Sequence, residues 1–123
     1  MKLFEKLLPP NTSRELVRLL HEEGYKAEDE HLLAFYVMVP DEEKGELLAK
    51  RLEEEGYSCE VEWNEEIGVW NCVCYARLHL EYKEIRAMSR QLDKWSRKEF
   101  GGVTLEWGLI AEEKDPNGES MKL

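Results

Sequence analysis

The stretch LLAFYVMVP, residues Leu32 to Pro40, decides the fold of this 123-residue chain. Eight apolar residues follow one another without a break, and several are aromatic or β-branched, the types that strands prefer. The run is too short for a buried helix, and Pro40 blocks its continuation. We therefore expect a strand whose two faces are both at least partly covered.

The sequence on either side of this strand predicts helices. Before it, Thr12 and Glu15 have the spacing of a capping box, and a helix is expected from about Ser13 to Glu23. After it, Asp41 can cap a second helix that ends near Gly56. The apolar stripe expected for this second helix is Leu47, Leu48 and Leu52.

Beyond Gly56 the pattern changes to that of strands. Cys59, Val61 and Trp63 alternate with Ser58, Glu60 and Glu62, as in a half-buried strand with its acids outward. A turn over Asn64 to Gly68 leads into a second apolar strand, Val69 to Leu80, so a hairpin is expected.

A long helix and a last strand complete the pattern. The helix runs from about Tyr82 to Phe100 and gathers six of the 17 Lys and Arg residues of the chain, more than any other predicted element. After Gly101 and Gly102, apolar and other residues alternate again. We expect Val103, Leu105, Trp107 and Leu109 on one face, and Thr104, Glu106 and Gly108 on the other.

The order after the first helix is β-α-β-β-α-β, which right-handed crossovers fold into a ferredoxin-like sandwich. We therefore predict an α+β fold with an extra N-terminal helix, in a single domain covering residues 1–123. Two helices would cover one face of the sheet. The other face is expected to expose part of Phe35, Val37, Val73 or Tyr75, unless the first helix or a second subunit covers it, and a partner is expected there.

Charge limits the classes of partner. Seventeen Lys and Arg residues against 27 Asp and Glu leave a formal charge of −10, which disfavours direct nucleic-acid binding and favours a basic partner. The same acids also serve solubility, the simpler interpretation. Without a membrane span or a secretory signal in the sequence, we expect a soluble cytoplasmic protein with no membrane partner.

Chemistry-bearing residues form no recognisable site. Cys72 and Cys74 share a strand face and could offer a metal two thiolates beside Cys59 or His79, but packing as small hydrophobes is favoured. The histidines lie at separate element ends. RNA-recognition domains share the predicted topology, yet the strand VWNCVCY, residues 69–75, lacks their aromatic motif. We expect no catalytic residue, metal or cofactor.

Several features together resemble a known family. Trp107-Gly108 is followed by Asp115-Pro116-Asn117-Gly118, and cysteines occupy the third strand at positions 72 and 74. The first two helices close at Glu23-Gly24 and Gly56-Tyr57, the latter before a strand at Glu60-Val61. In these features the chain resembles the family called regulator of ribonuclease E activity B, acidic bacterial proteins of ferredoxin-like fold, over about residues 13–118.

The resemblance implies a non-enzymatic regulator that binds ribonuclease E and modulates bacterial RNA decay. An acidic protein suits the basic region of that nuclease, or of another RNA-decay protein, because opposite charge steers association. The clustered basic helix and the lack of a long acidic tail depart from the family pattern. The residues predicted to contact the partner are Trp107, Asp115, Asn117, Glu60, Glu62 and Tyr75.

Two alternatives stay open. One is a small-molecule-binding or enzymatic ferredoxin-like protein, in the form of a homodimer, that uses the open sheet face around Phe35, Val73 and Tyr75. The other is a domain of the same fold whose partner differs from that of its relatives.

Overall fold

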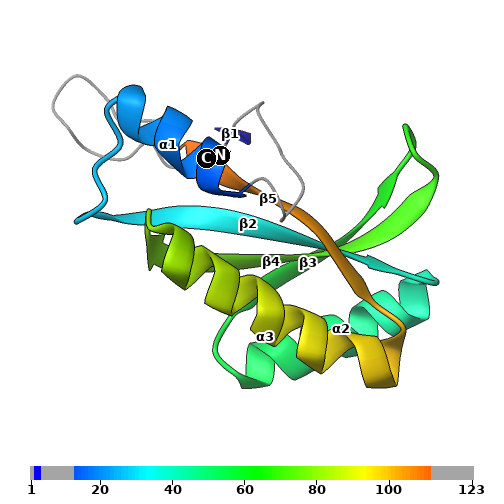
Figure 1. Cartoon of the computed structure of the whole chain (residues 1–123). Helices are drawn as coiled ribbons and strands as arrows, with labels where there is room; N and C mark the ends of the chain where they lie inside the picture. Colours follow the sequence, from blue (N-terminus) through cyan, green and yellow to red (C-terminus); the bar gives the residue numbers. More distant parts are fainter. Residues whose placement is uncertain (1, 4–12, 112–123) are drawn as a thin grey trace, which may run out of the picture.

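Strand β2 (Glu30–Val39) lies in the middle of a five-stranded sheet (Figure 1). The computed structural model describes residues 2–3 and 13–111. The strands lie in the order β1-β5-β2-β4-β3, and all neighbours are antiparallel. The other four strands are β1 (Lys2–Leu3), β3 (Ser58–Asn64), β4 (Val69–His79) and β5 (Val103–Ala111).

Three helices complete the structure: α1 (Ser13–Glu22), α2 (Glu42–Glu54) and α3 (Tyr82–Phe100). The elements after α1 follow the predicted order, and the α+β class is confirmed. Figure 1 shows α2 and α3 next to each other on one side of the sheet, where they are in contact. Strand β1 was not predicted, because two residues are too few to show a periodic pattern.

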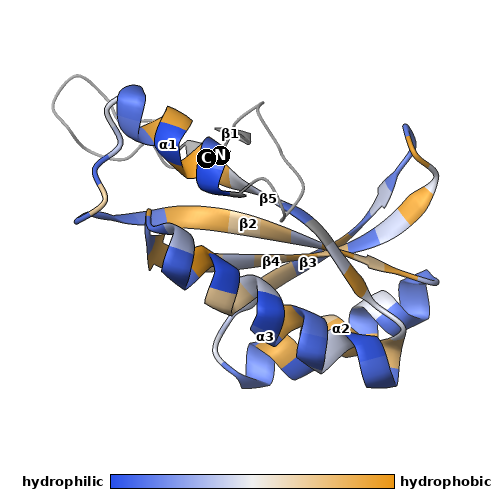
Figure 2. Ribbon diagram, viewed as in Figure 1, coloured by the Kyte–Doolittle hydropathy of each residue, from blue (hydrophilic) through white to orange (hydrophobic). Residues whose placement is uncertain are grey.

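Alternate residues of β2 form the centre of the hydrophobic core. Leu33, Phe35, Val37 and Val39 face the helices and are buried, and they pack with Cys72 and other residues of β4. The middle of β2 is strongly hydrophobic, whereas α2 and α3 mix hydrophobic and hydrophilic residues along their turns (Figure 2). The prediction that Phe35 and Val37 lie partly exposed on the open face is therefore wrong. Side chains alternate between the two faces of a strand, and Phe35 and Val37 point to the face that the helices cover.

Helix α1 packs into this same core. Its buried residues Leu16 and Leu20 belong to the cluster that contains Phe35, so α1 does not cover the opposite face of the sheet. The His21 Nε2 atom lies 2.7 Å from the carbonyl oxygen of Leu80, to which the imidazole can donate. This contact ties the end of α1 to the residue that follows β4.

The helix ends follow the predicted local rules. The Asp41 carboxylate accepts a hydrogen bond of 2.8 Å from the Lys44 backbone amide, which caps α2. At the end of α3, Gly101 adopts the left-handed conformation with φ +63°. The next amide, that of Gly102, donates to the Ser96 carbonyl at 3.1 Å and turns the chain into β5.

Two apolar positions differ from the prediction. Leu47 is 45% exposed, because the burial of Leu48 and Leu52 one turn apart turns Leu47 away from the sheet. Val103 is 37% exposed, because β5 pairs irregularly with β2. Glu106 lies opposite Tyr36 whereas Thr104 lies opposite Val37, so β5 carries one extra residue and its alternation reverses there.

The assignment of Phe35 to the core can be tested by truncation. We expect Phe35→Ala to lower the free energy of unfolding by about 3–5 kcal/mol, because it leaves a cavity under α3 and α1. Urea denaturation measures the change. The matched control is Leu47→Ala on the surface of α2, for which we expect a loss of less than about 1 kcal/mol. Equal losses would contradict the burial described above.

The turn between α3 and β5 requires glycine at position 102. A Cβ atom there would lie 2.8 Å from the Ser96 Cβ and 3.0 Å from the Val37 Cγ1, and both residues are buried. We expect Gly102→Ala to cost about 1–3 kcal/mol through overpacking, as measured by urea denaturation. In Gly56→Ala the backbone is strained at φ +97° but the new methyl group meets open space. A smaller loss in Gly102→Ala than in Gly56→Ala would contradict the steric argument.

Candidate functional site

The sheet face opposite the helices carries a row of side chains that crosses four strands. Glu60 of β3 lies opposite Val73 of β4, Val73 opposite Tyr36 of β2, and Tyr36 opposite Glu106 of β5. Directly opposed side chains of neighbouring strands lie about 5 Å apart at Cβ, so each member of the row reaches the next. The row therefore brings two carboxylates and a tyrosine from distant parts of the sequence onto one surface.

The flanking rows extend this surface. On one side Tyr75 lies between Ser58 and Ala34, and on the other Glu62 lies opposite Asn71. We call the surface formed by Tyr36, Glu60, Glu62, Tyr75 and Glu106 the acidic face.

Electrostatic interactions on the acidic face all favour neutral tyrosines. Burial, followed by the charges of Glu62, Glu106 and Glu60, raises the pKa of Tyr36 to about 12. Burial also raises the pKa of Tyr75, and a hydrogen bond to Glu60 adds to this. Burial and the charge of Glu60 raise the pKa of Glu62 as well. Negative charge is therefore concentrated on a partly dehydrated surface, which favours the binding of a cation.

A small apolar layer lies beneath these charges. Ala34, Val73 and Ile110 are buried on this side of the sheet, and Leu32, Tyr36 and Tyr75 pack against them partly buried. The acidic face thus combines carboxylate oxygens with aromatic rings over an apolar base. Such a surface can contact the aliphatic stem as well as the charge of a basic side chain.

Asn71 is an unusual polar residue in this setting. It is only 1% exposed, and its Oδ1 atom has no hydrogen-bond partner among the described residues. A buried acceptor without a partner costs about 1–3 kcal/mol, so it usually has a functional or a solvent-related reason. Its position opposite Glu62 places it at the margin of the acidic face.

The structure brings together three of the six predicted contact residues. Glu60, Glu62 and Tyr75 all belong to the acidic face. Trp107 lies in the core with no exposed area, so a direct contact through its side chain would require the sheet to open. Asp115 and Asn117 lie outside the described residues.

Sequence reasoning missed Tyr36 and Glu106 as members of this surface. Glu106 was expected on the outward side of its strand, but the sequence did not show that it shares a surface with Glu60. That neighbourhood follows from the strand order, in which β2 and β4 lie between β5 and β3. Tyr36 lies within a continuous apolar run, in which alternation gives no signal. Knowing that Phe35 is buried would have been enough to place Tyr36 on the opposite face.

The three cysteines lie on the other side of β3 and β4. Cys59 is directly opposite Cys74, and the buried Cys72 and Cys74 belong to the hydrophobic core. Hydrogen bonds with Cys59, together with burial, raise the pKa of the Cys72 and Cys74 thiols. No group of His, Cys, Asp and Glu side chains within residues 13–111 has a geometry suited to a metal ion.

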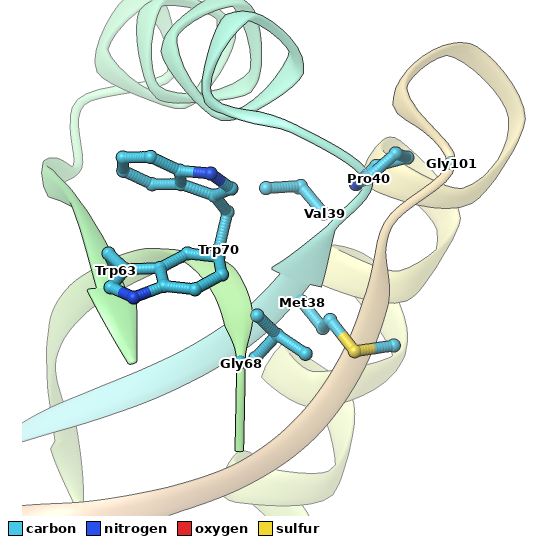
Figure 3. A pocket seen from close by; sticks show the side chains of 8 residues that line it. Met38, Val39, Pro40, Trp63, Gly68, Trp70 and Gly101 are labelled. Atoms are coloured by element: carbon cyan, nitrogen blue, oxygen red, sulfur yellow. The ribbon is translucent and has the colours of Figure 1, made fainter. Parts of the chain in front are cut away.

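A hollow of about 300 Å³ lies at the end of the sheet next to the β3–β4 turn (Figure 3). One of its lining residues, Met38, lies opposite Asn71 at the margin of the acidic face. It is lined by Met38, Val39, Pro40, Trp63, Gly68, Val69, Trp70 and Gly101. The rings of Trp63 and Trp70 lie 5.4 Å apart, and Trp63 is 48% exposed. Since none of these side chains can act as an acid or a base, the hollow offers apolar contact and no catalytic group.

Helix α3 carries charge of the opposite sign. Its exposed residues Arg86, Arg90, Lys94, Arg97 and Lys98 lie in the helical layer, which the sheet separates from the acidic face. Of these, Arg97 pairs with Asp93 at 2.7 Å. No helix in the described part of the chain is long and apolar enough to span a membrane.

Comparison with known proteins identifies the family. No curated protein sequence matches the chain. The sequence model of the family described as regulator of ribonuclease activity B matches residues 11–109. The match includes β2, β3, β4 and all of β5 except its last two residues, and it ends before the Asp115–Gly118 motif. The family assignment therefore does not depend on that motif. The chain therefore belongs to the regulator of ribonuclease activity B family.

Proposed function

We propose that the protein is a non-enzymatic regulator that lowers the activity of a ribonuclease of the ribonuclease E type by binding a basic segment on its acidic face. The observation that carries this proposal is the convergence of Glu60, Glu62 and Glu106 around two partly buried tyrosines, on the sheet face that the helices leave uncovered. Family membership supplies the class of target. The antiparallel order β5-β2-β4-β3 supports a ferredoxin-like assignment for this scaffold.

Electrostatics explains how such contact would reduce RNA cleavage. A basic segment that holds RNA does so mainly through its charge, because phosphate contacts dominate affinity for nucleic acids. A protein surface with clustered carboxylates competes for the same Lys and Arg side chains. The protein, with a formal charge of −10, would be steered towards such a segment and would repel the RNA itself.

The arrangement of side chains favours a binding role over catalysis. Tyr36, with a pKa of about 12, stays protonated at neutral pH and so cannot act as a base there. The alternative of a small-molecule or enzymatic homodimer on the open sheet face gains no support from the described residues, since the hollow near Trp63 and Trp70 has no acidic or basic side chain in its lining and Phe35 is in the core. Regulation of RNA decay would place the protein in the cytoplasm.

The proposal predicts inhibition that depends on charge and salt. We expect the purified protein to slow the cleavage of a fluorescent RNA by bacterial ribonuclease E at low ionic strength, and to do so less at high ionic strength because exposed charges are screened. We expect Glu60→Lys combined with Glu62→Lys to weaken inhibition at least about tenfold, since each reversed contact costs roughly 1 kcal/mol.

The matched control for this assay reverses two charges elsewhere. Glu65→Lys with Glu66→Lys changes the exposed turn between β3 and β4 by the same total charge. We expect a much smaller effect from this pair. If the wild-type protein does not slow cleavage at any salt concentration, or if both double variants weaken it equally, the proposal is wrong.

The carboxylates around Tyr36 also make the stability of the protein depend on pH. The pKa of Tyr36 is raised from 10.0 to about 12, so between these values the unfolded chain releases a proton that the folded protein keeps. The contribution of Tyr36 to stability is therefore fully present below pH 10 and is lost as the pH rises towards 12. Ultraviolet titration of tyrosinate should show a late step to which both Tyr36 and Tyr75 contribute. We expect Tyr36→Phe to reduce the amplitude of this step and Glu62→Gln to move it to lower pH. If the late step is unchanged in Glu62→Gln, the charge of Glu62 does not raise the pKa of Tyr36 as described.

A further inference from the structure

We infer that the acidic face is a receptor for a single arginine side chain of the protein partner, held between Glu60 and Glu62 with its guanidinium reaching Asn71. This inference rests on the proposed function and specifies the chemistry of the partner. Its starting point is the buried Asn71, which lies opposite Glu62 and whose Oδ1 atom has no hydrogen-bond partner within residues 2–3 and 13–111.

The number and arrangement of acceptors favour arginine over lysine. Glu60 and Glu62 lie on the same face of β3, two residues and so roughly 7 Å apart along the strand. A guanidinium has five donors in a planar fork, which can engage a carboxylate through two bonds and still reach a further acceptor. An ammonium group is a compact point charge and cannot span these positions in one plane.

The tyrosines add a second feature that suits a guanidinium. Tyr36 lies diagonally across β4 from Glu62, and Tyr75 is close enough to Glu60 for the carboxylate to raise its pKa. Arginine stacks on aromatic rings more often than lysine does. The apolar base formed by Ala34 and Val73 can contact the methylene groups of the arginine stem.

Charges of the opposite sign on this face lie further away. Arg77 is the basic residue of β4 on the same side, and it lies three rows along the strand from the Glu62 row. The exposed basic residues of α3 lie in the helical layer across the sheet. Within the part of the chain that the structure describes, no basic side chain shares a row with Glu60 or Glu62, so these carboxylates are complementary to a cation supplied by a partner.

The test uses three capped glycine-rich pentapeptides whose central residue is arginine, lysine or citrulline, the neutral isostere of arginine. Binding to the whole protein is followed by NMR of ¹³C-labelled tyrosine rings. We expect the arginine peptide to shift the Tyr36 and Tyr75 signals and to bind at least about threefold more tightly than the lysine peptide, with citrulline showing no binding.

Variants distinguish binding at the acidic face from nonspecific attraction to the negative charge of the protein. We expect Glu62→Gln to weaken arginine binding by about tenfold, and its matched control Glu65→Gln, on the exposed turn, to leave binding within about twofold of wild type. We expect Asn71→Leu to weaken arginine binding by about threefold while the melting temperature stays equal or rises, because the substitution removes an unpaired buried acceptor.

Several outcomes would overturn the inference. They are equal binding of the arginine and lysine peptides, an equal effect of Glu62→Gln and Glu65→Gln, or wild-type affinity in a folded Asn71→Leu variant. Dimerisation that Glu62→Gln abolishes would also overturn it, because the arginine would then come from α3 of a second copy. If cleavage of RNA is slowed but no arginine preference exists, only this inference fails. If arginine is preferred but cleavage is unaffected, the proposed function fails instead.

Discussion

The pairing of β2 with β4 on one side and β5 on the other is the constraint on which the rest of the structure depends. It extends over the whole length of β2 on the β4 side. Because side chains alternate across a sheet, this one register sends Phe35 into the core and Tyr36 to the opposite face. A slip of one residue would exchange the two sets. The hydrophobic core and the acidic face are therefore fixed by the same hydrogen bonds.

Much of the fold could be predicted from the sequence because its signals are local. Asp41 caps α2 and Gly101 ends α3 through contacts within a few residues, and the helices could be placed to within one or two positions. The position of Val103 could not be predicted, because a bulge exists only in relation to the partner strand. The faces of β2 were also undetermined, since a continuous apolar run carries no alternation.

The candidate site was predictable only in part, for a related reason. Glu60 and Glu62 could be recognised from the alternation within β3, but their neighbours on the face come from β2, β4 and β5. The same face holds the features that local rules disfavour, namely a buried unpaired amide oxygen at Asn71 and tyrosines among carboxylates. Proteins tolerate such conflicts mainly where function requires them. The core side of the same strands is mainly apolar, although the Thr104 hydroxyl there also has no partner among the described residues.

The distribution of charge gives the family assignment a physical meaning. An acidic surface repels the phosphates of RNA, yet it attracts the protein segments that bind those phosphates. On the proposed function, the protein needs no contact with RNA and no catalytic group of its own. The carboxylates project from backbone positions that the sheet fixes, above a base that is partly dehydrated. Glu60, Tyr36 and Glu106 lie in one row of paired strands, so their spacing is set by the sheet.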